Sequence, residues 1–185
     1  MDKLENGFFY HVYNRGNNKQ DIFLEEENYF HFLKLLKTHL IPVADIYCYC
    51  LLKNHFHILV RIKEKAANPS KSFSNLFNAY TKALNKKYNR TGSLFQRPFK
   101  RKRIGSEDYL RQLIVYIHLN PEAHNLIGDF RKYTYSSYKS LLSSKDTSLA
   151  RAEVMTLFDD KDNFKFIHCH RKNLKNEVLR AMIFE

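Results

Sequence analysis

The sequence predicts an α+β fold of ferredoxin-like type, an antiparallel sheet with packed helices. Segments typical of strands and helices follow one another in the order β, α, β, β, α, a short β element, α. Two neighbouring strands are separated only by Lys53 and Asn54, and a turn this tight joins antiparallel strands, which excludes a purely parallel sheet. With 185 residues, 44% of them hydrophobic, the chain can bury a sizeable core.

The first half of the chain contributes most of the predicted sheet. The segment GFFYHVYNRGNN alternates aromatic and polar residues before Gly16, as a strand running into a loop does. A helix is predicted over residues 25–40, because its first turn is acidic, its apolar residues have helical spacing and Pro42 follows it. Residues 43–52 and 55–62 then read as two strands.

The second half holds two longer helices, a basic segment and a tail. An apolar stripe predicts a helix ending near Lys87, and it consists of Phe73, Leu76, Phe77, Tyr80 and Leu84. SLFQRPFKRKRI predicts a short strand pair at an edge, and Ser106 caps a helix that should stop at Pro121. We expect one domain over residues 1–140 and a basic, partly helical extension over 141–185, with an amphipathic segment at 148–158.

The charge of the chain favours a polyanionic partner. Its net charge is +12 and its pI is about 9.6, and nucleic acid is the commonest partner of such a surface. A membrane is not expected, because no long apolar run is present. The first residues lack the pattern of a secretion signal, and three cysteines do not suit a disulfide framework. We therefore expect a cytoplasmic protein.

The segment KNHFHILV places two imidazoles on one face of a strand. His55 and His57 are two residues apart, so strand alternation directs both to the same side. Two ligands seldom suffice for a metal ion, so a third donor is needed. Tyr116 and Asn120, four residues apart, share one helical face and are the best candidates. A His–His–Asn site with open positions suits Mg²⁺ or Mn²⁺ in phosphate chemistry.

Each of these residues also has an ordinary structural explanation. Paired histidines can form a polar sheet face, a helical tyrosine can pack in a core, and asparagine before proline is common at helix ends. Tyr80 lies in the apolar stripe and is assigned to the core rather than to catalysis. A second His–x–His motif, IHCH at 167–170, is interpreted as surface, and a zinc site with Cys48 and Cys50 is disfavoured by their spacing.

Four motifs resemble one family in the expected order. CLLKNHFHILV resembles the HUH signature of the single-tyrosine transposases of small insertion sequences, and most of all their REP-associated branch. FYHVYNRGNNKQDIF, GSLFQRPFKRKRI and YLRQLIVYIHLNP also resemble segments of that family, over about residues 7–140. The resemblance implies a ferredoxin-like fold and a metal-dependent endonuclease and ligase activity on single-stranded DNA.

By the same resemblance, Tyr116 is the catalytic nucleophile that forms a 5′-phosphotyrosine link. His55, His57 and Asn120 match the positions that bind Mg²⁺ or Mn²⁺. Hairpin or single-stranded DNA is the implied partner, and a homodimer is one expected state. For DNA contact we nominate basic residues of two segments, namely Arg15, Arg97, Lys100, Arg101, Lys102 and Arg103.

Two other functions stay open from the residues. A catalytically inactive or domesticated relative would bind single-stranded or hairpin DNA without cutting it. A metal hydrolase would use water as the nucleophile, and Tyr116 would then only pack.

Overall fold

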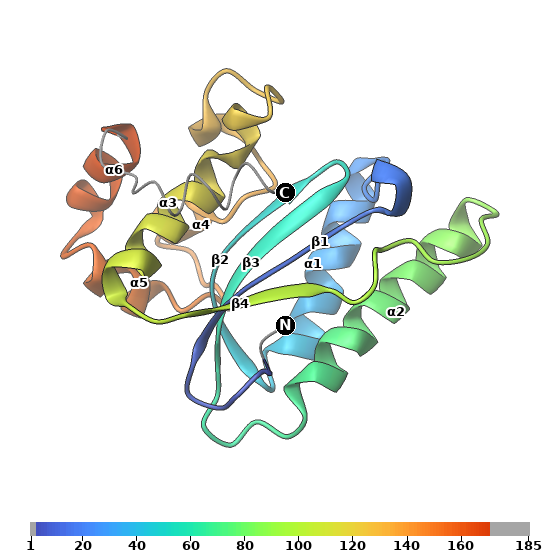
Figure 1. Ribbon diagram of the computed structural model, residues 1–185. Coiled ribbons are helices and arrows are strands. Elements are labelled where there is room, and N and C mark those ends of the chain that lie inside the picture. Colours follow the sequence, from blue (N-terminus) through green and yellow to red (C-terminus); the bar gives the residue numbers. More distant parts are fainter. Residues whose placement is uncertain (1–2, 171–185) are drawn as a thin grey trace.

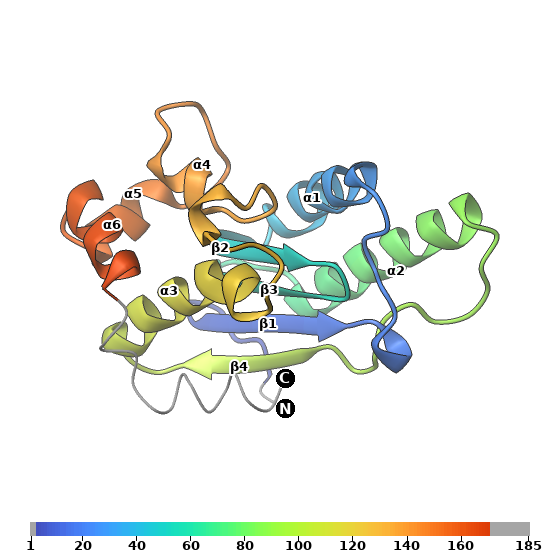
Figure 2. The ribbon, with the colours of Figure 1, turned by 90° about the horizontal axis from the view of Figure 1, so that it is seen from above.

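A four-stranded antiparallel sheet lies between two groups of helices in the computed structural model, which describes residues 3–170 (Figures 1 and 2). Neighbouring strands follow the order β2-β3-β1-β4. The strands are β1 (Phe9–Arg15), β2 (Ala44–Leu52), β3 (His55–Ile62) and β4 (Lys100–Ile104). Because β3 is inserted between β1 and β2, the sheet has the split β-α-β arrangement of ferredoxin-like folds, and the predicted α+β class is confirmed.

Two helices, α1 (Glu26–Leu40) and α2 (Pro69–Lys87), cover one face of the sheet (Figure 2). The side chain of Asn68 caps α2 by accepting a hydrogen bond from the backbone N–H of Lys71. Tyr80 is fully buried in the core between these helices and the sheet, and its hydroxyl donates to the carbonyl of Ile22 at 2.6 Å. The structure therefore agrees with the prediction that Tyr80 is a packing residue.

The other face is covered first by α3 (Glu107–Ala123), whose N-terminus is capped by the Ser106 hydroxyl. The prediction that this helix stops at Pro121 was wrong. Proline removes one backbone donor, but it lies in the last turn, where the N–H of His124 still bonds to the carbonyl of Asn120 at 2.9 Å. The helix therefore gains one more turn beyond the predicted site residues.

The last part of the chain forms short helices that pack against α3 and against the edge strand β2 (Figures 1 and 2). No helix within residues 3–170 is long and apolar enough to cross a membrane. The segment expected at 148–158 contains α5, whereas α6 was not predicted. The remaining helical elements are η1 (Asn17–Lys19), η2 (Phe130–Lys132), α4 (Tyr138–Leu142), α5 (Arg151–Leu157) and α6 (Lys161–Cys169).

A buried chain of hydrogen bonds joins α6 to α3. His168 donates from Nδ1 to the carbonyl of Phe164 at 2.7 Å, so its Nε2 accepts from Nδ1 of His118 at 2.9 Å. Nε2 of His118 then accepts from the hydroxyl of Ser137 at 2.8 Å. The interpretation of the IHCH motif as surface was wrong for His168, which is 0% exposed, although His170 is exposed.

The buried histidines His118 and His168 make folding stability depend on pH. Burial lowers the pKa of His168 from 6.5 to about 4 and holds that of His118 well below 6.5. The unfolded chain therefore binds more protons than the native one below pH 6.5, so stability is complete above that pH and is lost as the pH falls. The shifted pKa of His168 alone should lower the free energy of unfolding by about 3 kcal/mol between pH 7 and pH 4, which urea unfolding at the two pH values would measure.

In His168→Gln, the unfolding free energy should depend less steeply on pH. Unfolding should take up about one proton fewer than in the wild type, because glutamine does not titrate. The control His170→Gln should retain the pH dependence of the wild type, because His170 is exposed. Equal slopes for His168→Gln and the wild type would contradict the assignment.

Candidate active site

Two histidines of the central strand β3 point towards α3. His55 is 5% and His57 is 1% exposed, and their ring centroids are 5.2 Å apart. Phe56, between them, points to the opposite face and packs in the core under α1 and α2. The predicted alternation therefore places both imidazoles on the face covered by α3.

Successive turns of α3 lie opposite these two histidines. The ring of Tyr116 lies 5.6 Å from that of His57, and the ring of His124 lies 4.7 Å from that of His55, as centroid distances. Asn120 is one turn from each of these helix residues and therefore lies on the helix between the two contacts. The structure thus brings together the four residues that the sequence singled out.

Neighbouring side chains engage the Nδ1 atom of each imidazole. Nδ1 of His55 lies 2.6 Å from Oδ1 of Asn54, and an amide oxygen only accepts, so His55 donates from Nδ1 and keeps a lone pair on Nε2. Nδ1 of His57 lies 3.0 Å from Nε2 of His11. The Nε2 atom is therefore the ring nitrogen of both β3 histidines that is suited to a ligand.

Burial keeps these imidazoles neutral. It lowers the pKa of His55 to about 3, with smaller contributions from His124 and the positive charge of Arg15. The pKa of His57 is held well below 6.5 by burial first and then by neighbouring histidines, and that of His11 falls to about 3. A neutral imidazole is the form that binds a metal ion.

Asn120 presents its carbonyl oxygen to this site. Its Nδ2 donates to the backbone carbonyl of Tyr116 at 3.1 Å. Within residues 3–170, Oδ1 of Asn120 and Nε2 of His55 are buried without a hydrogen-bond partner. Buried polar atoms are normally paired, so two such atoms in one site fit a missing ligand. No group of three or more His, Cys, Asp or Glu within residues 3–170 could hold a metal ion, so a metal site built on His55 and His57 would require a donor of another type, such as the amide oxygen of Asn120.

A small pocket of about 150 Å³ opens beside the histidines, and Arg15 and Lys100 give it a positive charge. Tyr116 is 2% exposed and does not line this pocket. A molecule that enters the pocket would therefore contact the histidines before the tyrosine. The lining residues are Tyr13, Asn14, Arg15, His55, Phe56, His57, Gln96 and Lys100.

Four of the six basic residues nominated for DNA contact lie on β4, an edge strand, and they divide between its two faces. Lys102 pairs with His11, so it lies on the face of the histidines together with Lys100, whereas Arg101 and Arg103 alternate to the other face. Arg103 forms an ion pair with Glu5 at 3.0 Å. These residues therefore do not form one continuous patch on a single face.

Two residues of the site were missed from the sequence. His11 follows the strand alternation of FYHVYN and could have been assigned to the histidine face of β1. His124 lies beyond Pro121, where the helix was expected to have ended. Cys48 and Cys50 are buried on the same face of the sheet, where they pack in the core under α3.

Known proteins show the same fold. One solved structure, a REP-associated tyrosine transposase bound to a REP hairpin, matches with a TM-score of 0.65 and 16% sequence identity over 78% of this chain and 84% of that chain. No curated protein matches the sequence. The family model described as "Transposase IS200 like" matches residues 6–120, more than half of the chain. The resemblance read from the motifs is thereby confirmed, and the chain belongs to the family of IS200-like transposases.

Proposed function

We propose that the protein cleaves and rejoins single-stranded DNA beside hairpins, with Tyr116 as the nucleophile. The observation that carries this proposal is the meeting of α3 with β3, where Tyr116 lies against His57 and Asn120 lies one turn further along the same helix. Membership of the IS200-like transposases supports DNA cleavage. The hairpin bound to the structurally similar protein supports the choice of substrate.

In the proposed reaction, the hydroxyl oxygen of Tyr116 attacks the phosphorus of a phosphodiester. The bond to the 3′ oxygen breaks, a 5′-phosphotyrosine link forms, and the phenolic proton ends on the released 3′-hydroxyl. Rejoining is the same exchange in reverse, so no external energy source is required. Arg15 and Lys100, which line the pocket beside the histidines, hold the phosphate backbone without reading its sequence.

Mg²⁺ or Mn²⁺ fits the donors present in this site. His55 and His57 would hold the ion through their Nε2 atoms, and Asn120 through Oδ1. When bound, such an ion polarises the scissile phosphate and offsets charge on the departing oxygen. His11 contacts the other ring nitrogen of His57 and thereby orients it.

The nucleophile is tested by trapping. Labelled hairpin DNA with randomised flanks, incubated with Mn²⁺, should give a slowly migrating covalent species on a denaturing gel. Tyr116→Phe should abolish it, because phenylalanine has no hydroxyl, whereas the control Tyr80→Phe should form it.

An adduct that persists in Tyr116→Phe would move the nucleophile to another residue. Cleavage without any adduct would favour attack by water. Tight binding without cleavage would favour the DNA-binding alternative.

The metal site is tested by ligand removal. EDTA should stop adduct formation and leave hairpin binding intact. Asn120→Ala should reduce adduct formation at fixed Mn²⁺ by at least the roughly 10- to 100-fold that loss of a ligand's hydrogen-bond partner costs, because a direct donor is removed. Full cleavage by Asn120→Ala at limiting Mn²⁺ would exclude this residue as a ligand. Calorimetric titration with Mn²⁺ provides a readout independent of activity, and Asn75→Ala, an exposed change on α2, is the control.

His11 acts as a positioning residue in this proposal. His11→Phe removes the contact with Nδ1 of His57 and should raise the Mn²⁺ concentration needed for half-maximal cleavage roughly 10- to 100-fold. The maximal rate at saturating Mn²⁺ should change much less. A lower maximal rate with an unchanged Mn²⁺ requirement would contradict the positioning role, and His39→Phe on α1 is the control.

A further inference from the structure

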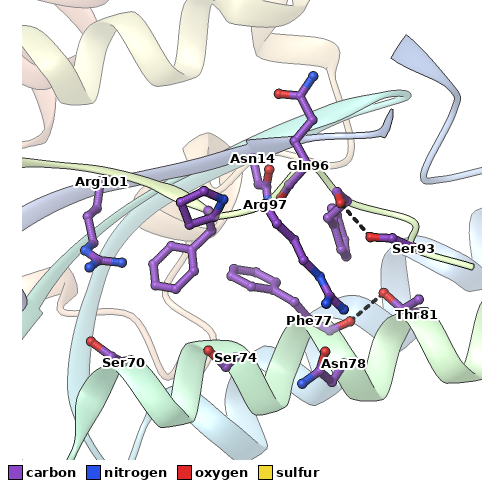
Figure 3. A pocket seen from close by; sticks show the side chains of 13 residues that line it. Asn14, Ser70, Ser74, Phe77, Asn78, Thr81, Ser93, Gln96, Arg97 and Arg101 are labelled. Atoms are coloured by element: carbon purple, nitrogen blue, oxygen red, sulfur yellow. Dashed lines mark hydrogen bonds between the residues drawn. The ribbon is translucent and has the colours of Figure 1, made fainter. Parts of the chain in front are cut away.

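A second, larger pocket lies between α2 and the segment before β4 (Figure 3). Its volume is about 590 Å³, within the range of roughly 300–1,000 Å³ typical of sites for small organic ligands. One wall is a face of α2 with Ser70, Ser74, Asn78 and Thr81. The opposite wall is the segment from Ser93 to Arg101. Nothing in the proposed cleavage reaction uses this pocket.

Aromatic rings form the interior of this pocket. The ring of Phe77 lies 5.4 Å from that of Phe95 and 5.3 Å from that of Phe99, as centroid distances. The guanidinium of Arg101 lies 4.9 Å from the centroid of the Phe99 ring. Flat apolar surfaces beside a guanidinium suit a planar, electron-rich ring such as a nucleobase.

The rim of the pocket is polar and positively charged. Among the thirteen residues that line it, none is acidic and two, Arg97 and Arg101, are cationic. Figure 3 shows the Arg97 side chain extending across the opening towards α2, near Asn78 and Thr81. Within residues 3–170, Arg97 forms no ion pair. A phosphate at the rim would therefore find a cation that no carboxylate occupies.

The pocket is adjacent to the smaller pocket beside the histidines. Asn14 and Gln96 line both this pocket and the smaller pocket beside the histidines. The shared wall is fixed, because Nδ2 of Asn14 donates to the carbonyl of Gln96 at 3.2 Å and the N–H of Gln96 donates to the carbonyl of Arg15 at 2.9 Å. A strand whose phosphate lies at the histidines can therefore place a neighbouring nucleotide here.

We propose that this pocket binds an unpaired nucleotide that flanks the scissile phosphate. Its base lies against the phenylalanine rings, the α2 hydroxyls and Asn78 contact its polar edge, and Arg97 contacts its phosphate. The inference rests on the proposed function, since it assumes a single-stranded DNA substrate. It adds a substrate subsite to α2, which the cleavage chemistry leaves without a role.

The test compares a hairpin carrying a randomised four-nucleotide single-stranded flank with the same hairpin without it. Affinities are measured by fluorescence anisotropy in EDTA, for 5′ and 3′ flanks separately. Ser74→Trp fills the pocket from an exposed helix position, and Asn75→Trp is its control, exposed but outside the lining. Arg97→Ala removes the rim cation, and Lys86→Ala removes an exposed α2 cation outside the pocket.

The wild type should bind one flanked hairpin more tightly than the blunt one. Ser74→Trp should lower affinity for that flanked hairpin by about tenfold, the effect of losing one stacked base, and leave the blunt hairpin unchanged. Arg97→Ala should act in the same direction, and both controls should match the wild type. The inference fails if neither flank adds affinity, or if Ser74→Trp and Arg97→Ala affect flanked and blunt hairpins equally or not at all.

These measurements are independent of cleavage. If Tyr116→Phe still formed a covalent adduct, the proposed nucleophile would be wrong, while the flank-dependent affinity would still decide the pocket. Conversely, an intact adduct assay with no flank effect would leave the proposed function standing without this subsite.

Discussion

The packing of α3 against β3 is the contact on which the site depends. Residues from Leu113 to Pro121 are all buried, so this part of the helix is enclosed on every side. One side meets the histidines of the sheet through Tyr116, and another meets α6 through His118. The position of Tyr116 is therefore set from two directions, and α6 takes part in placing it.

Burial of the helix also determines the electrostatics of the site. Excluding water from His55, His57 and His11 lowers the pKa of each imidazole and leaves all three neutral near pH 7. Neutral rings are held in a defined orientation by Asn54 and by contact with each other. The packing that stabilises the fold thus also prepares the nitrogen atoms for a ligand, so core and site are not separable parts of the molecule.

Local patterns were sufficient for the central part of this site. Strand alternation placed His55 and His57 on one face, and helical spacing placed Tyr116 with Asn120, because both rules act over a few residues. His124 was missed because the rule for proline ends helices too early when proline falls in the last turn. His168 was misread because its burial depends on the docking of α6 onto α3, a contact between distant segments that no local pattern encodes.

The arrangement of the basic segment at β4 was also not predicted from the sequence, and this arrangement bears on function. From the sequence it reads as one cluster, but alternation along β4 sends Lys100 and Lys102 to the histidine face and Arg101 to the face of α2. Because these cations lie on both faces of an edge strand, a nucleic acid lying flat on one face would contact only some of them. The single strand is instead expected to cross the sheet edge near Gln96, where the two pockets meet, with phosphates held on either side. The geometry of one exposed strand thus connects the proposed place of cleavage to the pocket proposed for the neighbouring nucleotide.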